Sequence, residues 1–400
     1  MSDGVPAGSE AGASTSRDRW FGVGSSTGGD GAAAGHEAAV EAMVGDDPKL
    51  VVVFCSAGLD LQAVVNPIAA AAPGVPMIGC TTAGEIATGA AGTGGVTVAV
   101  LGGDFSAAST FVEIADGDLF EAGNRAGAVV TQIPDREHTV VLLLTDGLAG
   151  NQQEVVRGVY NRIGAAVPLV GGCAGDDAAM VKTFQVCDGT VIENAVVAAV
   201  IGSDAPIGIG VQHGWRPVGE PMLVTSSGDT GVTELDGQPA LDRYLDKAGM
   251  PAALKTDQEA VTTFAMTHPL GLRRRAAEGV RFITGADVEA GTLTSIAELP
   301  EGSLVWLMEG DRRSVLAGTT ASCEDALDQL GANDPIGLLL FDCIARKTVL
   351  GPDGVAAEME TIGSVLETVP TAGFYTYGEF ARTRGARGFH NQTLVALALS

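Results

Sequence analysis

Basic residues, long apolar stretches and paired cysteines are scarce in this 400-residue chain. Each shortage excludes a class of protein. Lys and Arg number 23 against 49 Asp and Glu, which leaves a formal charge of −26. So acidic a surface repels phosphate backbones, and we expect no nucleic-acid partner. The longest apolar stretch, residues 195–202, is far shorter than a bilayer requires. We therefore expect no membrane insertion.

The six cysteines stand singly, and no CxxC or CxxCH motif occurs. This excludes zinc-ribbon, thioredoxin and c-type haem readings and favours reduced cysteines in a cytoplasmic protein. Residues 1–19 are rich in Ser, Gly and Ala and lack the apolar core of a signal peptide, so they are expected to form a disordered tail. Walker, GxGxxG and GxSxG motifs are also absent.

The 46% of apolar residues is enough for a sizeable core, and 400 residues predict more than one domain. Helical and strand-like segments alternate without a strict βαβ rhythm, which predicts a mixed α/β fold of mixed sheets covered by helices. A boundary near Asp236 divides the chain into residues 20–235 and 236–400.

A repeated string is the most informative feature that the chain does contain. Residues 76–86 (PMIGCTTAGEI) return at 370–380 (PTAGFYTYGEF), and a third copy, 168–177 (PLVGGCAGDD), lacks one residue. Each copy follows an apolar run, at 50–56, 140–146 and 337–343. A unit of strand, helix and glycine-rich turn is therefore duplicated, which predicts two or three pseudo-equivalent lobes with a ligand cleft between them.

Several elements can be predicted from local signals. Asp188-Gly189 indicates a hairpin turn, and Pro67 predicts a break in, or a start of, a helix between residues 60 and 72. The other predicted elements are helices at 30–42, 151–163, 239–248, 323–330 and 353–366 and strands at 261–266, 280–284, 304–308 and 393–399.

Polar residues follow the apolar runs and the glycine-rich turns. Ser56, Asp146 and Asp342 end the runs, where α/β sheets commonly present ligand contacts. The turns carry Glu85, Asp176, Asp177 and Glu379. A carboxylate beside exposed backbone amides suits an amino group or a zwitterion, although the same residues can cap neighbouring turns. Both interpretations remain open.

Three histidines, His213, His268 and His390, are the candidates for haem or metal ligation. No two histidines have HxxxH spacing, so we expect no metal site, and hydrogen-bonded or pocket-lining roles are favoured. Cys80 in the first repeat is a candidate nucleophile, but the third repeat has Phe374 and Tyr375 in that region, so the repeat does not require sulfur.

Aromatic residues make up only 5% of the chain, yet several gather near the third repeat. Strand alternation places Tyr375 and Tyr377 on one face, where they form either core or the wall of a ligand pocket. With Glu379, His390 and Asn391 they predict a pocket in the C-terminal domain. The full set of predicted ligand-binding residues is Glu85, Asp176, His213, Tyr375, Tyr377, Glu379, His390 and Asn391.

Taken in order, the motifs LVVVFCS, PMIGCTTAGEI, PLVGGCAGDD, QHGWRPVGE, VTELDGQPALDRY, PTAGFYTYGEF and GFHNQTLVALAL resemble the FIST family, with an N-terminal and a C-terminal FIST domain. The resemblance implies a sensory domain of signal transduction that binds small ligands such as amino acids. Some members are described as haem-containing nitric-oxide sensors, and others are joined to kinase, cyclase or F-box regions.

No output region is evident in this chain, so we expect a stand-alone, non-catalytic sensor that acts on a partner in trans, such as a histidine kinase or a cyclase. No cofactor is expected. A haem b-based nitric-oxide sensor and a thiol-dependent enzyme using Cys80 are the alternatives.

Overall fold

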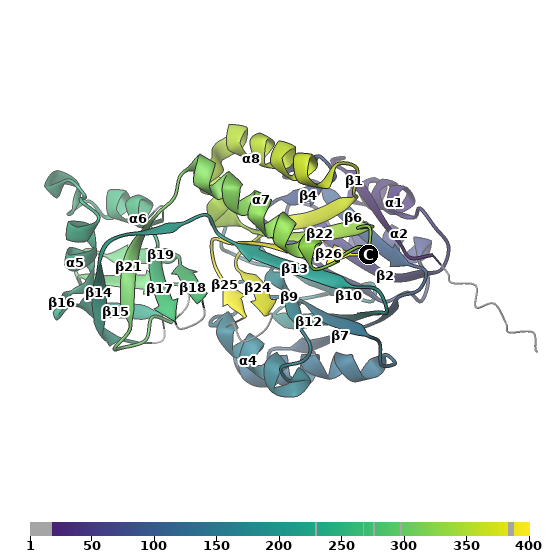
Figure 1. The fold of residues 1–400 in the computed structure, drawn as a ribbon, viewed down its shortest axis with the longest axis horizontal. Coiled ribbons are helices and arrows are strands. Elements are labelled where there is room, and N and C mark those ends of the chain that lie inside the picture. Colours follow the sequence, from purple (N-terminus) through teal and green to yellow (C-terminus); the bar gives the residue numbers. More distant parts are fainter. Residues whose placement is uncertain (1–17, 229, 267, 275–276, 297, 383–387) are drawn as a thin grey trace, which may run out of the picture.

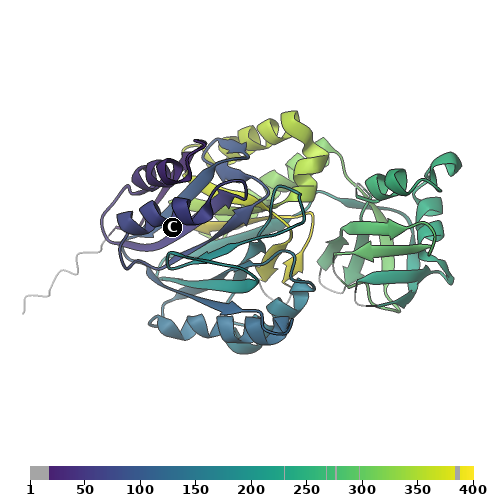
Figure 2. The same cartoon turned by 180° about the vertical axis from the view of Figure 1, so that it is seen from behind.

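The computed structural model describes residues 18–400 except 229, 267, 275–276, 297 and 383–387. These residues form a large body and a small lobe joined by two chain crossings (Figures 1 and 2). The body holds three six-stranded sheets, and the small lobe, residues 216–309, holds an eight-stranded sheet. The predicted mixed α/β class is confirmed. Within the described ranges, no helix is long and apolar enough to cross a bilayer.

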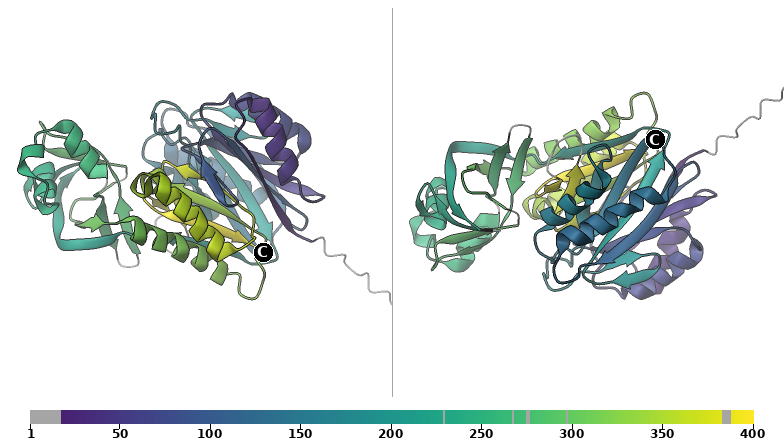
Figure 3. Two further views of the ribbon diagram at one scale, coloured as in Figure 1. Left: turned by 90° about the horizontal axis from the view of Figure 1, so that it is seen from above. Right: turned by 90° about the horizontal axis from the view of Figure 1, so that it is seen from below.

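The body consists of three units with the same order of elements, whose helices lie on different sides of the body (Figure 3). Unit 1 contains β1 (Trp20–Ser26), α1 (Gly31–Ala42), β2 (Pro48–Ser56), α2 (Leu61–Ala71), β3 (Met77–Thr82), β4 (Glu85–Ala87), β5 (Ala90–Gly92) and β6 (Val96–Gly102). Unit 2 contains β7 (Ser106–Glu113), α3 (Leu119–Ala126), η1 (Gly127–Gln132), β8 (His138–Thr145), α4 (Gln152–Ile163), β9 (Leu169–Cys173), β10 (Gln185–Cys187), β11 (Thr190–Ile192) and β12 (Ala195–Ser203). Unit 3 contains β13 (Ile207–Gln212), α7 (Arg312–Asp328), β22 (Gly337–Cys343), α8 (Ile344–Leu366), β23 (Thr371–Thr376), β24 (Glu379–Arg382), β25 (Phe389–His390) and β26 (Leu394–Leu399).

Each unit gives its short hairpin to a neighbouring sheet. The sheets are ordered β1-β6-β2-β3-β10-β11, β7-β12-β8-β9-β24-β25 and β13-β26-β22-β23-β4-β5. The hairpin of unit 1 therefore joins unit 3, that of unit 3 joins unit 2, and that of unit 2 joins unit 1. The glycine-rich turn of each repeat is the point at which the chain passes from its own sheet to the next one.

The small lobe is inserted in unit 3, because the chain leaves the body after β13 and returns at α7. It contains β14 (Arg216–Ser227), β15 (Gly231–Leu235), β16 (Gln238–Pro239), α5 (Ala240–Lys247), η2 (Ala252–Leu254), α6 (Gln258–Met266), β17 (Leu270–Arg274), β18 (Ala277–Arg281), β19 (Ile283–Asp287), β20 (Thr292–Ser295) and β21 (Leu304–Glu309). The lobe has its own apolar core, which includes Met222, Leu241, Tyr244 and Val305. The predicted division of the chain at Asp236 into an N-terminal domain (20–235) and a C-terminal domain (236–400) stays a prediction. In space, strands from both sides of that position share sheets, since β13 pairs with β26 and β9 with β24.

Most predicted elements are present, and the Asp188-Gly189 turn does join β10 to β11. Two predictions are wrong. Residues 261–266 belong to helix α6, because Asp257 accepts hydrogen bonds from the backbone N–H groups of Glu259 and Ala260 and caps it. Helix α2 runs through Pro67, since burial of Leu61, Val64, Val65 and Ile68 outweighs the hydrogen bond that proline removes.

Two other helices are longer than the sequence suggested. α7 begins at Arg312, where Asp311 and Ser314 form a capping box, and not at residue 323. The predicted helix at 353–366 is the second half of α8, which is interrupted at Gly351, a residue with φ of 64°. The first half of α8 starts directly after β22 and brings Arg346 beneath the sheet edge.

Candidate functional site

The three glycine-rich turns meet at one place in the body, where each turn donates a backbone hydrogen bond to, or accepts one from, the next unit. The contacts are Ala83 N to Tyr375 O (2.9 Å), Cys173 N to Gly378 O (2.8 Å) and Gly175 N to Thr81 O (3.0 Å). The turns also lie at the carboxyl ends of the parallel pairs β2–β3, β8–β9 and β22–β23. The repeat therefore forms one central junction, named here the turn junction.

Two of the predicted carboxylates, Glu85 and Glu379, are buried and occupy equivalent places at the turn junction. Thr82 Oγ1 donates to Glu85 Oε1 and Thr376 Oγ1 donates to Glu379 Oε1, both at 2.5 Å. The second oxygen of each accepts a hydrogen bond from a backbone N–H at 3.1 Å, that of Gly95 or of Thr393. Burial raises the pKa of both carboxyl groups to about 7, although these hydrogen bonds act to lower it. Each carboxyl thus ties a turn to the chain just before β6 or β26.

Asp176 and Tyr377, both predicted as ligand contacts, lie side by side. The Tyr377 hydroxyl donates to Asp176 Oδ1 and accepts from the backbone N–H groups of Asp176 (3.2 Å) and Ala178 (2.9 Å). Asp176 also accepts from the N–H groups of Met180, Val181 and Lys182. Burial opposes ionisation of Asp176, but these hydrogen bonds outweigh it, and its pKa lies below the ordinary value.

The same pair holds a strained loop. Asp177, Ala178 and Met180 all have positive φ, between 53° and 68°, a region that residues with a side chain seldom adopt. Because the Tyr377 hydroxyl satisfies two backbone amides of this loop, we expect Tyr377→Phe to lower the free energy of unfolding by about 1–3 kcal/mol. Chemical denaturation measures the change. Tyr160→Phe is the control, since no described residue hydrogen-bonds that hydroxyl, and an equal loss in both variants would contradict the assignment.

Tyr375 is fully buried in the core of the body. Its hydroxyl donates to Glu358 Oε2 at 3.3 Å, and Lys347 Nζ lies 4.9 Å from the ring centroid. Glu358 belongs to a buried ion cluster, defined here as Asp342, Arg346 and Glu358. The Arg346 guanidinium donates to Asp342 Oδ1 (2.6 Å) and Glu358 Oε1 (2.7 Å), and all three side chains are at most 1% exposed.

The third repeat leads into a loop with unmet hydrogen-bonding capacity. Among the described residues, seven buried side-chain N or O atoms have no hydrogen-bond partner, and six belong to Trp215, Asp342, Asn391 and Gln392. The Asp342 atom belongs to the buried ion cluster, where burial raises the pKa of this carboxyl. The remaining five are Trp215 Nε1 and both amide atoms of Asn391 and Gln392. Buried polar atoms are normally paired, so these five are open to a partner such as a bound water or a ligand.

Trp215 directly precedes β14 of the small lobe, and Asn391 and Gln392 directly follow β25, which contacts β18 of the lobe (Figure 1). Trp215 packs against Val280 and Met308 of the lobe. His390 is close enough to Arg281 of the lobe and to His213 for both to lower its pKa, and with burial as the main cause that pKa falls to about 4. Burial, with Arg346 nearby, likewise lowers the pKa of His213 to about 4. Both imidazoles are therefore neutral at pH 7. We call Trp215, Asn391 and Gln392 the lobe-junction site.

The structure brings some of the predicted residues together and separates others. Asp176 and Tyr377 are in contact, and His213 and His390 lie at the lobe junction. Asn391 directly follows His390, and its Nδ2 lies 3.5 Å from the position that a Cβ of Gly378 would take. Glu85 and Tyr375 lie at the turn junction and within the core. Gln392 and Trp215 were missed, although Gln392 directly follows His390-Asn391 and Trp215 lies two residues after His213. Of the strand ends, Ser56 Oγ donates to Asp177 Oδ2 (3.3 Å), and Asp146 Oδ1 accepts from Thr183 Oγ1 (2.8 Å).

The haem alternative can be tested against the three histidines. His213 Nδ1 accepts from the Trp215 N–H, so its other nitrogen carries the proton, and His390 Nε2 contacts Ala381 O at 2.9 Å. His268 Nδ1 contacts Phe264 O at 2.9 Å, which orients the ring. However, His268 lines a 580 Å³ pocket whose other walls include Arg216, Glu309, Asp311 and Arg313. Walls so charged do not fit a porphyrin face.

A metal site and a nucleophilic Cys80 are the two remaining alternatives. No group of three His, Cys, Asp or Glu side chains among the described residues is arranged to hold a metal ion. Cys80 is fully buried, and burial, followed by the neighbouring Cys173, Cys55 and Glu85, raises the pKa of its thiol well above the ordinary value. These surroundings favour the thiol over the thiolate that a nucleophile requires.

Three pseudo-equivalent units, a shared turn junction and an inserted small lobe define a mixed α/β protein. The FIST N domain model matches residues 49–238 and the FIST C domain model matches residues 240–382. The chain belongs to the FIST family, whose domains are sensory domains of signal transduction.

Curated relatives agree with this placement. The uncharacterized protein Rv0628c of Mycobacterium tuberculosis is 26% identical over 388 residues, which cover 93% of this chain and 97% of the relative. The uncharacterized protein MJ1623 of Methanocaldococcus jannaschii is 31% identical over 155 residues, or 36% of this chain and 30% of the relative. The uncharacterized protein Mb0898c of Mycobacterium bovis is 28% identical over 193 residues, 46% of this chain and 48% of that one.

Proposed function

We propose that the protein is a sensor that binds a small zwitterionic metabolite, such as an amino acid, at the lobe-junction site and signals to a partner in trans. One observation carries the proposal: five buried polar atoms of Trp215, Asn391 and Gln392 have no partner among the described residues. Ligand sites typically combine apolar walls with a few convergent polar groups. The apolar side chains of Val280 and Met308 around Trp215 supply such walls.

The chemistry of the five atoms favours a ligand with both donors and acceptors. Trp215 Nε1 and the two amide NH₂ groups donate hydrogen bonds and suit a carboxylate, whereas the two amide oxygens accept and suit an ammonium group. An amino acid carries both groups on adjacent atoms. A purely anionic or purely cationic ligand would leave part of this set unpaired, at a cost of about 1–3 kcal/mol for each buried group.

The position of the site suggests how binding reaches a partner. Asn391 and Gln392 are at most 1% exposed, so we expect the ligand to enter when the small lobe moves away from β25. The crossings between lobe and body include Gly214, with φ of 78°, and Gly310, both small residues at which a hinge can form. A histidine kinase or cyclase that contacts both parts would sense the lobe position. The six unpaired cysteines favour a cytoplasmic setting for this exchange.

A paired stability and binding measurement tests the proposal. We expect Asn391→Leu and Gln392→Met to leave the unfolding midpoint of the ligand-free protein unchanged or higher, because each removes a buried unpaired amide. The same variants should weaken binding of the amino acid found in a thermal-shift screen by at least about tenfold. In that screen, a ligand at 100 times its Kd should add about 2.7 kcal/mol of stability.

Gln185→Met is the matched control, because Gln185 is also fully buried but its amide is paired with Ala195 N (3.2 Å) and Thr183 Oγ1 (3.3 Å). We expect it to lower stability and to leave ligand affinity unchanged. Loss of stability in Asn391→Leu and Gln392→Met, together with no stabilisation by any amino acid, would contradict the proposal. A Soret band in protein produced with haem, lost on replacing His268, would favour the haem alternative.

A further inference from the structure

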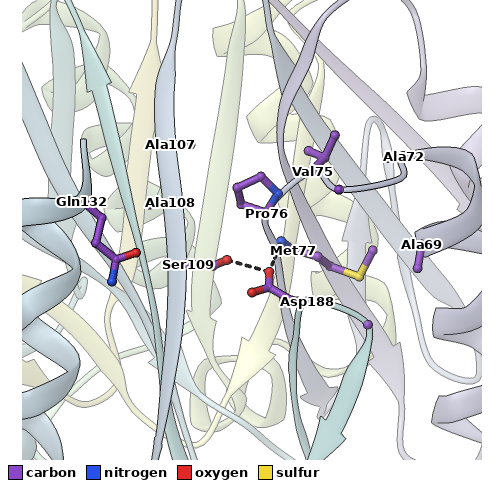
Figure 4. A pocket seen from close by; sticks show the side chains of 12 residues that line it. Ala69, Ala72, Val75, Pro76, Met77, Ala107, Ala108, Ser109, Gln132 and Asp188 are labelled. Carbon is purple, nitrogen blue, oxygen red and sulfur yellow. Dashed lines mark hydrogen bonds between the residues drawn. The ribbon is translucent and has the colours of Figure 1, made fainter. Parts of the chain in front are cut away.

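A groove of about 430 Å³ lies between units 1 and 2, far from the lobe-junction site. Its walls come from the end of α2, the start of β3, strand β7 and the β10–β11 turn, and Figure 4 shows Ser109, Asp188 and Met77 meeting within it. The groove lies at the amino end of β3, whereas the turn junction follows its carboxyl end. Six strand residues separate the two, roughly 15–20 Å.

The groove lies at a strand in which unit 2 differs from units 1 and 3. The first strands of units 1 and 3 carry glycine pairs, Gly22/Gly24 and Gly208/Gly210, on which α1 and α7 lie directly. A Cβ at any of the four would come within 2.1 Å of a helix carbonyl oxygen. The equivalent strand β7 has the sequence SAASTFVE, without glycine, and its residues 106–110 are only half-buried. This strand is therefore left open to form a wall.

Strand β7 presents its edge to the groove. Among the described strands it is the last of its sheet and pairs only with β12. Side chains alternate along a strand, yet the consecutive residues Ala107, Ala108 and Ser109 all line the groove. The groove thus runs along the unpaired edge, where backbone carbonyl groups of β7 are available as hydrogen-bond acceptors.

Asp188 gives the groove its charge. It is the one charged residue of the described lining, which otherwise includes Ala69, Ala72, Val75, Pro76 and Met77. Its Oδ1 accepts from Met77 N (3.0 Å) and Ser109 Oγ (2.6 Å), which fixes the side chain. The Cys187 thiol is a further polar neighbour of this carboxylate, and no cationic side chain of the described lining competes for it.

We propose that this groove is a second binding site, which takes a linear aliphatic amine. The ammonium group donates to the Asp188 carboxylate and to carbonyl oxygens along the β7 edge, and the alkyl chain lies on the alanine, valine, proline and methionine wall. A carboxylate on the ligand would find no cationic partner in the lining, so amines without one are favoured over amino acids. The formal charge of −26 raises the local concentration of such cations.

Isothermal titration of the full chain with 1,4-diaminobutane and 1-aminobutane tests the site, with 1-butanol as the uncharged comparison. We expect saturable binding of both amines and none of the alcohol. Asp188→Asn should weaken amine binding by about 10- to 100-fold. The Asn oxygen still accepts from Met77 and Ser109, and asparagine tolerates the left-handed backbone of this position (φ of 49°). The unfolding midpoint should therefore stay unchanged.

Asp116→Asn is the matched control, because Asp116 is also exposed and left-handed (φ of 51°) but lies outside the groove. It should bind amines as the unmodified chain does. Ala108→Met, which fills the groove and keeps Asp188, should also weaken binding. Equal losses in Asp188→Asn and Asp116→Asn would show mere attraction to an acidic surface and overturn the proposal, as would the absence of saturable amine binding. Amino-acid binding at the lobe junction should be unaffected by all three variants.

Discussion

Replacing Arg346 by methionine should lower the free energy of unfolding by about 3–5 kcal/mol. Arg346 is fully buried and pairs with two buried carboxyl groups, those of Asp342 and Glu358. Its guanidinium also donates to Thr319 Oγ1 (2.6 Å) and to the backbone oxygen of His213 (3.2 Å). Methionine fills similar space without charge, so the variant leaves buried acidic groups without their cation. Chemical denaturation at pH 7 measures the loss.

A double-mutant cycle identifies the cause. In a Glu358→Gln background one of the two carboxyl groups that pair with Arg346 is absent, and the cost of Arg346→Met should fall by at least about 1 kcal/mol. Arg157→Met serves as the control, because Arg157 pairs with Glu154 on the surface of α4 (2.7 Å) and is 63% exposed. An exposed pair of this kind contributes about 0–1 kcal/mol. A loss below about 1 kcal/mol for Arg346→Met would contradict a stabilising role for the buried ion cluster.

The three repeated turns could be predicted from the sequence. The exchange of the hairpins that follow them between units could not. The strings at 76–86, 168–177 and 370–380 predicted equivalent units, and all three are present. A glycine-rich turn looks the same whether the following hairpin joins its own sheet or another. The choice depends on contacts such as Cys173 N to Gly378 O, which lie more than 200 residues apart. The inserted small lobe was missed for the same reason, since β13 and β26 pair across nearly the whole second half of the chain.

The candidate site was predictable in part. His390 and Asn391 stood out because a histidine and an amide follow an aromatic repeat. The structure places His390 close to Arg281 of the small lobe and the Asn391 amide beside Gly378. The sequence around Trp215 did not indicate a site residue, apart from the nearby His213. Its surroundings depend on Val280 and Met308 of the small lobe, which are distant in the sequence. A sequence signal for Arg346 was overlooked. Asp342 and Arg346 are four residues apart at a strand–helix boundary, and only Cys343, Ile344 and Ala345 separate them. Whether Glu85, Tyr375 and Glu379 touch a ligand stays a prediction.

Above pH 7, Glu379→Gln should make the protein more stable than the unmodified chain by about 1–3 kcal/mol. Burial raises the folded-state pKa of Glu379 to about 7, from an ordinary value of 4.5. Between those values the folded state holds a proton that the unfolded state releases, so the stability contributed by this group falls as pH rises. Below pH 4.5 both states are protonated, and the contribution is fully present.

Glutamine imitates the protonated acid. Its carbonyl oxygen can accept from the Thr393 N–H (3.1 Å) and hydroxyl (2.8 Å), and its NH₂ group can donate to Thr376 Oγ1. The variant should therefore match the unmodified chain near pH 4.5 and exceed it at pH 8. The measured quantity is the difference in unfolding free energy between the two proteins at each pH, which cancels the other titrating groups.

Glu85→Gln should behave in the same way, because Glu85 has an equivalent place in unit 1 and a pKa also raised to about 7 by burial. The two sites are held by different threonines, Thr82 and Thr376, so the effects should add in the double variant. Glu360→Gln, at an exposed position of α8, should show no pH-dependent difference. If Glu379→Gln were instead less stable at pH 8 than at pH 4.5 relative to the unmodified chain, the carboxylate would be the form that the turn junction stabilises, and the assigned direction of the pKa shift would be wrong.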